Sequence, residues 1–144
     1  MQAIILAAGS STRTWPLTVN SPKSLLKIAN KSILEHNLEQ LEDLADEVIL
    51  VVGFKAEMIK AAFGSEFRKI TIKYAGQKEQ LGTGHALLQA EKYAKEKFIV
   101  LVGDDLFFKE DLLKLTNEKY ALLAQEVEKP ENFGAIEEEN GYLR

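Results

Sequence analysis

Phosphate binding is indicated by the residue types that follow the first apolar run of the chain. Positions 3–8 are apolar, and a glycine, three hydroxyl residues and an arginine come directly after them: Gly9, Ser10, Ser11, Thr12 and Arg13. Gly9 lets the backbone turn without a Cβ in the way. Hydroxyl groups and the planar guanidinium of Arg13 are donors that match phosphate oxygens. Taken alone, the pattern fits an ordinary turn with a surface arginine equally well.

The local charge favours the anion-binding interpretation. Residues 1–31 contain no Asp or Glu, within a chain of net charge -4, but they include four basic residues: Arg13, Lys23, Lys27 and Lys31. A basic area confined to one part of an acidic protein suits a small anion better than a polymer. We therefore expect neither nucleic acid nor an anionic membrane surface as a partner. Pro22 fixes the approach of Lys23, which we assign to the same anion site.

A second polar segment, residues 77–85, has the groups needed to recognise a nucleotide base. The amides of Gln77 and Gln80 can donate and accept hydrogen bonds together, so a glutamine here can read the edge of a uracil-like base. Gly82 permits close approach of a ligand, and Thr83 can either cap the following helix or contact that ligand. The alternative is a capped helix after a polar loop. His85 is expected to be structural, since no cluster of acids or cysteines surrounds it.

A metal site is indicated where the apolar run 98–102 ends in Gly103, Asp104 and Asp105. A carboxylate at the end of a strand, opposite a phosphate loop, can hold Mg²⁺, which prefers one or two carboxylates together with phosphate oxygens. A bare pair of aspartates is more often a solvated loop. Only the combination with the first loop favours Asp104 as a magnesium ligand.

The hydrophobic patterns place these residues on alternating strands and helices. Strands are expected over residues 3–8, 47–52, 70–75, 98–102, 120–127 and 133–138, and helices over 32–44, 55–63, 84–95 and 110–118. The first of these helices has a capping box that starts at Ser32. The alternation predicts right-handed βαβ units and a mostly parallel sheet. Because ligands bind beyond the carboxyl ends of such strands, the loops after 3–8 and 98–102 can face one crevice.

The composition fits a single domain. The chain has 144 residues, of which 46% are hydrophobic, and no cysteine, which excludes disulfides and thiolate metal sites. The apolar start is too short for a signal peptide or a membrane span, so a cytoplasmic location is expected. The pair Asn140-Gly141 predicts a hairpin. Its second arm has only begun when the sequence stops, and we therefore expect an incomplete domain.

The conjunction of these motifs resembles the signature of the nucleoside-diphosphate-sugar pyrophosphorylases, also called sugar-1-phosphate nucleotidylyltransferases. The first motif matches at Leu6, Ala7, Ala8, Gly9, Thr12, Arg13, Pro16, Thr18, Pro22 and Lys23. Gln77 and residues 80–86 are similar to the uridine-binding segment of N-acetylglucosamine-1-phosphate uridylyltransferases. Asp104 resembles the metal-binding aspartate of the family, and Gly134 resembles its sugar-contacting glycine. The likeness is greatest to archaeal enzymes that join this domain to a β-helix acyltransferase.

The resemblance implies a Rossmann-like three-layer α/β sandwich with a mostly parallel sheet, of which residues 1–144 would form the nucleotide-binding part. It implies nucleotidyl transfer from UTP or dTTP to glucose 1-phosphate or N-acetylglucosamine 1-phosphate, with Mg²⁺ as cofactor and pyrophosphate as the second product. The rest of the domain, a second metal-binding aspartate and any β-helix domain are expected beyond residue 144. The fragment alone is therefore expected to be inactive, and the full-length protein could form a homo-oligomer.

The resemblance also assigns roles to individual residues. Arg13 would bind the β- and γ-phosphates, and Lys23 the α-phosphate region. The nucleotide would be held by Leu6, Ala7, Ala8, Gly9, Ser10, Ser11, Thr12, Gln80 and Thr83, with Gln77 and Gly82 at the base, Gly134 at the sugar and Asp104 at the metal. Ser11 stands where the family usually has a glycine, and its small side chain is expected to be tolerated. Two alternatives stay open: a non-catalytic nucleotide-binding module, and a transferase with another base preference, such as CTP or GTP.

Overall fold

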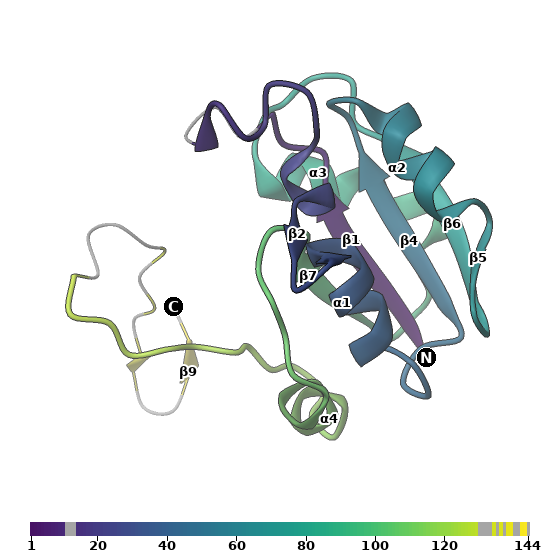
Figure 1. Cartoon of the computed structure of the whole chain (residues 1–144). Helices are drawn as coiled ribbons and strands as arrows, with labels where there is room; N and C mark the ends of the chain where they lie inside the picture. Colours follow the sequence, from purple (N-terminus) through teal and green to yellow (C-terminus); the bar gives the residue numbers. More distant parts are fainter. Residues whose placement is uncertain (11–13, 130–133, 135, 137, 140–141, 144) are drawn as a thin grey trace.

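A five-stranded sheet with the strand order β5-β6-β4-β1-β7 forms the centre of the computed structural model (Figure 1). The structure describes residues 1–10, 14–129, 134, 136, 138–139 and 142–143. The strands of this sheet are β1 (Gln2–Ala7), β4 (Glu47–Val52), β5 (Glu66–Phe67), β6 (Ile70–Gly76) and β7 (Phe98–Val102). The helices are α1 (Ile33–Gln40), α2 (Ala56–Phe63), α3 (Thr83–Leu88) and α4 (Lys109–Thr116). Short elements complete the chain: η2 (Lys23–Leu25), β2 (Lys27–Ile28), β3 (Lys31–Ser32), η3 (Glu91–Tyr93), β8 (Glu138–Glu139) and β9 (Tyr142–Leu143).

The sheet is mostly parallel, as predicted, and its winding direction reverses at β1. The central strand β1 pairs in parallel with β4 and with β7, β6 pairs in parallel with β4, and β5 is antiparallel to β6. The chain moves outward from β1 through β4 to β6, and then returns to the other side of β1 to form β7. In open α/β sheets such a reversal leaves a crevice beyond the carboxyl ends of the two strands. The structure thus places the loops after β1 and β7 at one edge.

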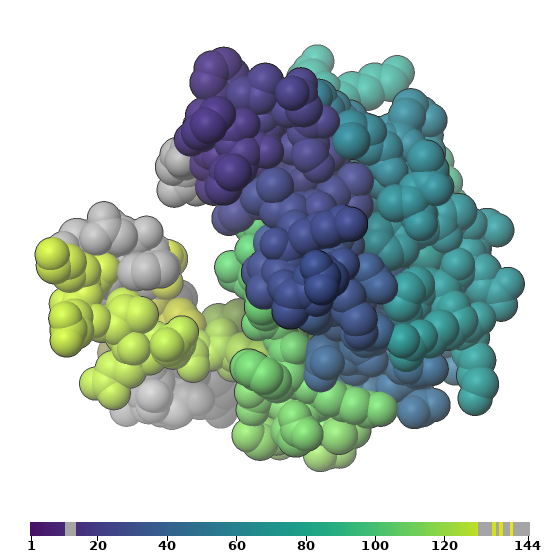
Figure 2. Space-filling model, in the orientation of Figure 1, coloured from purple at the N-terminus to yellow at the C-terminus, as the bar shows by residue number. Residues whose placement is uncertain are grey.

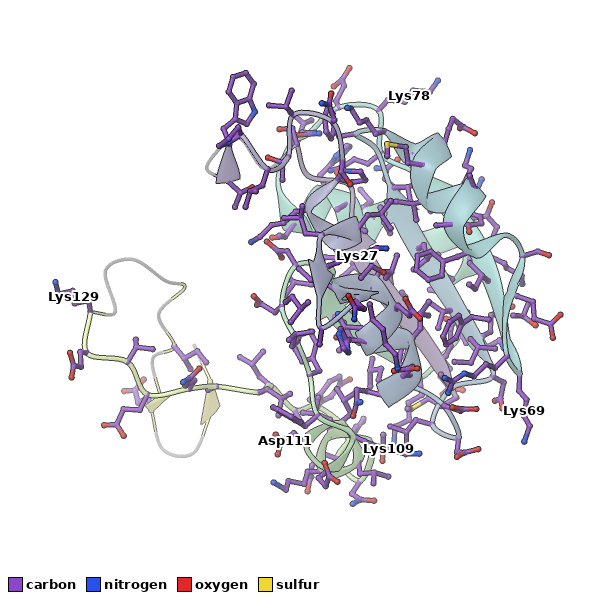
Figure 3. The ribbon with its side chains drawn as sticks, in the orientation of Figure 1. Lys27, Lys69, Lys78, Lys109, Asp111 and Lys129 are labelled. Atoms are coloured by element: carbon purple, nitrogen blue, oxygen red, sulfur yellow. The ribbon has the colours of Figure 1, made fainter. Side chains whose placement is uncertain are left out.

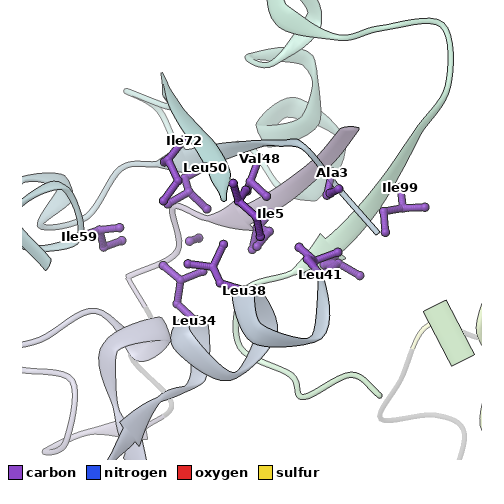
Figure 4. Packing of buried hydrophobic residues seen from close by; sticks show 14 of the residues in the cluster. Ala3, Ile5, Leu34, Leu38, Leu41, Val48, Leu50, Ile59, Ile72 and Ile99 are labelled. Atoms are coloured by element: carbon purple, nitrogen blue, oxygen red, sulfur yellow. The ribbon is translucent and has the colours of Figure 1, made fainter. Parts of the chain in front are cut away.

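Helices cover both faces of the sheet and make it a three-layer structure. In Figure 1, α1 and α2 lie in front of the sheet and α3 lies behind it. Along β1, Ala3 and Ile5 point to the side of α1, and Figure 4 shows Leu34 and Leu38 of α1 directed at the strands there. Ile4 points to the opposite side, toward the small residues of α3. Because β1 is covered on both faces, its sequence is apolar throughout instead of alternating.

Two predicted helices differ from the structure in length. Ser32 caps α1 by accepting a hydrogen bond from the backbone N–H of Glu35 at 3.1 Å, which confirms it as the N-cap, but the helix ends at Gln40. The helix predicted over 84–95 is interrupted and consists of α3 followed by η3. The prediction that Thr83 caps it was wrong, since Thr83 is already helical. The N-cap is Gly82, whose φ of +96° is readily reached only by glycine.

The strand predicted over residues 120–127 is absent from the structure. These residues have no regular secondary structure, and Tyr120 is 87% exposed. Side chains that favour strands are not sufficient to form one, because an extended segment also needs a neighbouring strand to pair with its backbone. Of the strand predicted over 133–138, residues 133, 135 and 137 lie outside the described residues, 134 and 136 are not in a strand, and 138 begins β8. The antiparallel pairing of β8 with β9 confirms the predicted hairpin, although its turn at 140–141 is not described.

The two ends of the sheet are distinct surfaces. In Figure 3, Lys78, which follows β6, marks the end where the carboxyl ends of the strands lie, and Lys69, which precedes β6, marks the opposite end. Figure 2 shows the segment after α4 standing apart from the body across a hollow. Among the described residues, no helix is long and apolar enough to cross a membrane.

Candidate functional site

A cavity of about 290 Å³ lies beyond the carboxyl ends of β1 and β7. It is lined by Leu6, Ala7, Ala8, Gly9, Lys23, Ser24, Gln77, Gln80, Gly82, Thr83, Ala86, Val102, Gly103 and Asp104. The structure thus brings together Gly9 of the first loop, residues of the segment 77–85 that is predicted to read the base, and Asp104, which are far apart in the sequence. Its volume is near the lower end of the range of roughly 300–1,000 Å³ for small-molecule sites.

The loop after β1 is held by the base-reading segment. The side chain of Gln80 donates through Nε2 to the carbonyl oxygen of Ala8 at 3.0 Å and accepts at Oε1 from the backbone N–H of Ser10 at 3.3 Å. The backbone N–H of Phe54 also donates to the Ala8 carbonyl oxygen, at 3.1 Å. Gln80 therefore positions the loop in addition to lining the cavity. The Ser10 N–H, a candidate phosphate donor, is bound to Gln80 in this structure.

Two opposite charges meet at the cavity. Nζ of Lys23 lies 2.7 Å from Oδ2 of Asp104, and the two side chains are 29% and 46% exposed. Lys23 begins η2 directly after Pro22, whose extended backbone (φ -63°, ψ 147°) precedes the turn. An ion pair this open to water is worth little to the stability of the fold. Both ions are therefore available to a charged ligand.

The loop that carries Asp104 is fixed from beneath by a buried side chain of α1. Asn37 is fully buried; its Nδ2 donates to the carbonyl oxygen of Asp105 at 2.8 Å, and its Oδ1 accepts from the backbone N–H of Phe107 at 3.3 Å. Sequence reasoning missed this residue. The signal that could have found it is its place on the apolar stripe of α1, three positions after Leu34 and one before Leu38. A polar side chain buried there needs hydrogen-bond partners, because burying an unpaired amide is costly.

The residues present fit a magnesium ion that is held jointly with a nucleotide. Asp104 is the carboxylate that lines the cavity, and the described residues contain no group of three or more His, Asp or Glu side chains that could form a metal cage. Mg²⁺ commonly takes one or two carboxylates and fills its remaining positions with phosphate oxygens and water. A single carboxylate beside a loop predicted to bind phosphate has this donor chemistry.

Gln77 is the most buried of the predicted base-reading residues. Its side chain is 6% exposed, and its backbone N–H donates to the carbonyl oxygen of Val52 at 2.8 Å, which extends the pairing of β6 with β4. Its Nε2 lies 3.0 Å from Nδ1 of His85. His85 is thus a direct contact of Gln77, a role that the absence of acids and cysteines around it did not indicate.

Ser24 adds a hydroxyl group that sequence reasoning did not assign. Its residue is 4% exposed, it lines the cavity, and its Oγ is buried without a hydrogen-bond partner among the described residues. Such a group is uncommon in a folded protein, where buried polar atoms are almost always paired. The structure therefore shows a hydroxyl beside Lys23 with unused hydrogen-bonding capacity.

Among the described residues predicted for the site, Ser10 and Gly134 do not line this cavity. Ser11, Thr12 and Arg13 lie outside the described residues. Gly134 lines a separate hollow, together with Asp105 and residues 123–127. The roles predicted for these residues stay predictions.

Comparison with known proteins gives consistent matches over nearly the whole chain. A family model described as nucleotidyl transferase matches residues 2–143. The bifunctional protein GlmU of Methanococcus vannielii is 46% identical over 138 residues, which are 95% of this chain and 32% of that protein. The UTP–glucose-1-phosphate uridylyltransferase AglF of Haloferax volcanii is 44% identical over 108 residues, 74% of this chain and 44% of the relative. The chain thus spans about a third of the first relative and under half of the second.

A solved structure confirms the fold class. A protein of Bacillus anthracis, assigned as a glucose-1-phosphate thymidylyltransferase, superimposes with a TM-score of 0.85 at 25% identity. The match covers 99% of this chain and 62% of that chain. The predicted α/β fold with a mostly parallel sheet is therefore shared with a structure of this kind.

Proposed function

The chain belongs to the nucleotidyl transferase family, and from that premise we propose that its parent protein transfers a nucleotidyl group from UTP or dTTP to a sugar 1-phosphate. The observation that carries the proposal is the cavity beyond β1 and β7, where Lys23, Asp104 and the buried amide of Gln77 meet. These three groups suit, in turn, a phosphate, a metal ion and a base. Together they match the parts of a nucleoside triphosphate bound with Mg²⁺.

The reaction needs no nucleophile from the protein. An oxygen of the sugar phosphate attacks the α-phosphorus, a new P–O bond forms, and the bond from the α-phosphorus to the bridging oxygen breaks as pyrophosphate leaves. Catalysis of such a displacement depends on positioning and on neutralising the charge that develops. The ammonium of Lys23 would stabilise the α-phosphate region, and Arg13 is assigned to the leaving pyrophosphate. Asp104 would hold Mg²⁺, which supplies further neutralisation of phosphate charge.

The choice of UTP or dTTP is supported by the glutamine at the cavity. The amide of Gln77 offers hydrogen-bonding groups from a position that is almost free of solvent, and Gly82 beside it leaves space for a planar base. The relative from Haloferax volcanii is named for UTP and glucose 1-phosphate, which agrees with this assignment. Glucose 1-phosphate and N-acetylglucosamine 1-phosphate are both proposed acceptors, with Gly134 assigned to the sugar.

The proposal is tested by measuring pyrophosphate release by the full-length protein with UTP and each sugar 1-phosphate. Lys23→Ala and Asp104→Asn are each expected to lower kcat by about 100-fold or more, as removal of one transition-state charge partner does elsewhere. Lys69→Ala is the matched control, because Lys69 is an exposed cation at the opposite end of the sheet (Figure 3). We expect it to keep normal activity.

Three outcomes would contradict the proposal or part of it. Near-normal turnover of both site variants would remove Lys23 and Asp104 from the mechanism. Nucleotide binding without turnover in the full-length protein would identify a non-catalytic module instead. Thermal stabilisation by CTP or GTP, but not by UTP or dTTP, would transfer the same reaction to another base.

A further inference from the structure

The side chain of Gln77 is held by a short series of hydrogen bonds that continues into α3. Its Nε2 lies 3.0 Å from Nδ1 of His85 and 3.3 Å from the carbonyl oxygen of Gly82. On the other side of the ring, Nε2 of His85 lies 3.1 Å from Nε2 of Gln89, which also donates to the carbonyl oxygen of His85 at 3.1 Å. The two glutamines therefore contact the two nitrogens of one imidazole.

A count of protons shows that this series has two arrangements. A neutral imidazole has one N–H donor and one acceptor nitrogen, whereas an amide nitrogen is a donor only. If Nδ1 of His85 is the acceptor, Gln77 donates to it and Gln89 turns its amide oxygen toward the ring. If Nδ1 carries the proton, Gln77 must turn its own oxygen toward the ring. The tautomer of His85 and the orientation of the Gln77 amide are therefore coupled.

The carbonyl group of Gly82 favours the arrangement in which Nδ1 is the acceptor. In that arrangement Nε2 of Gln77 donates to both His85 and Gly82, whereas a turned amide would place Oε1 against the Gly82 carbonyl oxygen. Gln77 is nearly buried, so water would not relieve that contact. In this arrangement the amide of Gln89 turns and loses its hydrogen bond to the His85 carbonyl oxygen. Because Gln89 is partly exposed, its amide nitrogen can then bind water.

The amide oxygen of Gln77 is then the group left for a ligand. Among the described residues, Gln77 makes its side-chain hydrogen bonds through Nε2. Its Oε1 is not one of the buried atoms that lack a hydrogen-bond partner, so it remains accessible to solvent. Gln77 lines this cavity and also borders a hollow beside α2, and we infer that its Oε1 is presented to a molecule bound in the cavity.

We propose that His85 is a positioning residue for base selection, which fixes the amide of Gln77 with Oε1 toward the cavity. The inference rests on the proposed function, because it requires the base of the nucleotide to enter this cavity. An oxygen acceptor at this position pairs with the imide N3–H of uracil or thymine. Cytosine has a lone pair at N3 instead, which would face Oε1 without a proton between them. His85 thus favours UTP and dTTP over CTP without contacting the base.

The test compares the dissociation constants of UTP and CTP, with Mg²⁺, for the full-length protein and four variants. One well-oriented hydrogen bond in a dry site corresponds to about a tenfold change in affinity. We expect His85→Leu to lower the preference for UTP over CTP by about tenfold, mainly through weaker UTP binding. Gln77→Leu should lower it by at least as much. His85→Asn, whose amide can take the place of Nδ1, should restore part of the preference. His36→Leu removes the other histidine, which lies in α1 and does not line the cavity, and should keep the preference unchanged.

A nitrogen NMR spectrum supplies a readout that a purely structural role of His85 would not affect. The chain has two histidines, so the ring signals of His85 are identified by their loss in His85→Asn. We expect an unprotonated Nδ1 and a protonated Nε2, both in the free protein and with UTP bound. This measurement and His85→Asn decide the question if His85→Leu does not fold.

The outcomes separate this inference from the proposed function. If His85→Leu keeps the UTP preference and Gln77→Leu loses it, Gln77 reads the base unaided, and the inference is wrong while the proposed function stands. A protonated Nδ1 in the UTP complex would also overturn it. If the unaltered protein binds none of the nucleotides, the proposed function itself fails and the inference fails with it.

Discussion

At the scale of single residues, Gly103 lies directly against the end of β1. The backbone N–H of Gly103 donates to the carbonyl oxygen of Leu6 at 2.8 Å. A Cβ on Gly103 would lie 2.8 Å from that oxygen and 3.0 Å from the Cβ of Ala7. Both neighbours belong to the buried central strand and have no room to move. Gly103 therefore lets the loop that carries Asp104 reach the cavity.

We predict that Gly103→Ala destabilises the protein by about 1–3 kcal/mol, the usual cost of overpacking a rigid site. Urea unfolding at equilibrium measures the change. Gly84→Ala is the matched control, because a Cβ there would meet no atom within 4 Å and Gly84 lies in α3. That variant should be neutral or more stable by up to about 1 kcal/mol. Equal stability of Gly103→Ala and the unaltered protein would refute the steric argument.

The sequence indicated the residues that line the cavity better than the residues that hold them in place through hydrogen bonds. Lys23, Gln77 and Asp104 were predicted from their types and their sequence context, and the structure brings all three to one cavity. Asn37 and His85 act through hydrogen bonds to groups 68 and 8 residues away, and nothing in the local pattern specifies those partners. Partners of this kind become visible only when the topology brings the segments together.

At the scale of elements, a buried carboxylate joins the strands at the end of the sheet opposite to the cavity. Glu47, at the start of β4, is 8% exposed; its Oε1 accepts from Nε2 of Gln2 in β1 at 2.7 Å, and its Oε2 pairs with Lys73 in β6. Gln2 also accepts from the backbone N–H of Lys95, which ties down the segment before β7. One side chain thus links three neighbouring strands.

We predict that Glu47 makes the stability of the fold sensitive to acid. The hydrogen bonds from Lys73 and Gln2 lower the pKa of Glu47 from 4.5 to about 2 in the folded protein. Its stabilising contribution, roughly 3 kcal/mol at most, is therefore complete above pH 4.5 and is lost as the pH falls from 4.5 toward 2.

Chemical unfolding of the unaltered protein and of Glu47→Gln at several pH values checks this prediction. The difference in free energy of unfolding between the two proteins should be largest near neutral pH and should shrink below pH 4.5. An equal difference at every pH would show that Glu47 does not titrate differently in the folded and unfolded chains.

The elements that the sequence predicted best are those whose burial is complete. The apolar runs of β1 and β4 can only be strands of a covered parallel sheet, and the structure confirms both. The segment 120–127 has similar side chains but no strand beside it with which to pair. Pairing is a property of the whole sheet, so the local sequence could not exclude a strand there.

At the scale of the whole molecule, the two edge strands of the sheet differ in how well they are protected against pairing with another chain. One edge is β5, which is only two residues long and begins with the charged Glu66. The other edge is β7, which pairs with β1 on one side and has no Pro or charged residue in its five positions. Val100 in its middle is 39% exposed, and a hollow of about 420 Å³ runs along the strand toward residues 118–123. An edge of this kind is a template for further strand pairing.

We predict that the 144-residue chain associates through β7 as its concentration rises. Val100→Lys should shift the chain toward the monomer, because a charged side chain on an edge strand disfavours pairing with a second copy. Sedimentation over a range of concentrations measures the effect. Thr71→Lys, at an exposed position of the inner strand β6, is the control and should leave the association unchanged. Identical sedimentation of all three chains would show that the β7 edge is not the contact.

The pairing of Lys23 with Asp104 has a consequence for how ligands compete for the cavity. Each ion is the counter-ion of the other. A phosphate that bound Lys23 alone would leave the charge of Asp104 without a partner. A divalent cation that bound Asp104 alone would likewise leave the charge of Lys23 without a partner. Under the proposed function, a nucleotide that arrives with its metal would replace both partners in a single exchange. If the proposed function holds, the protein should therefore respond to a nucleotide and a divalent cation added together more strongly than to either ion added alone.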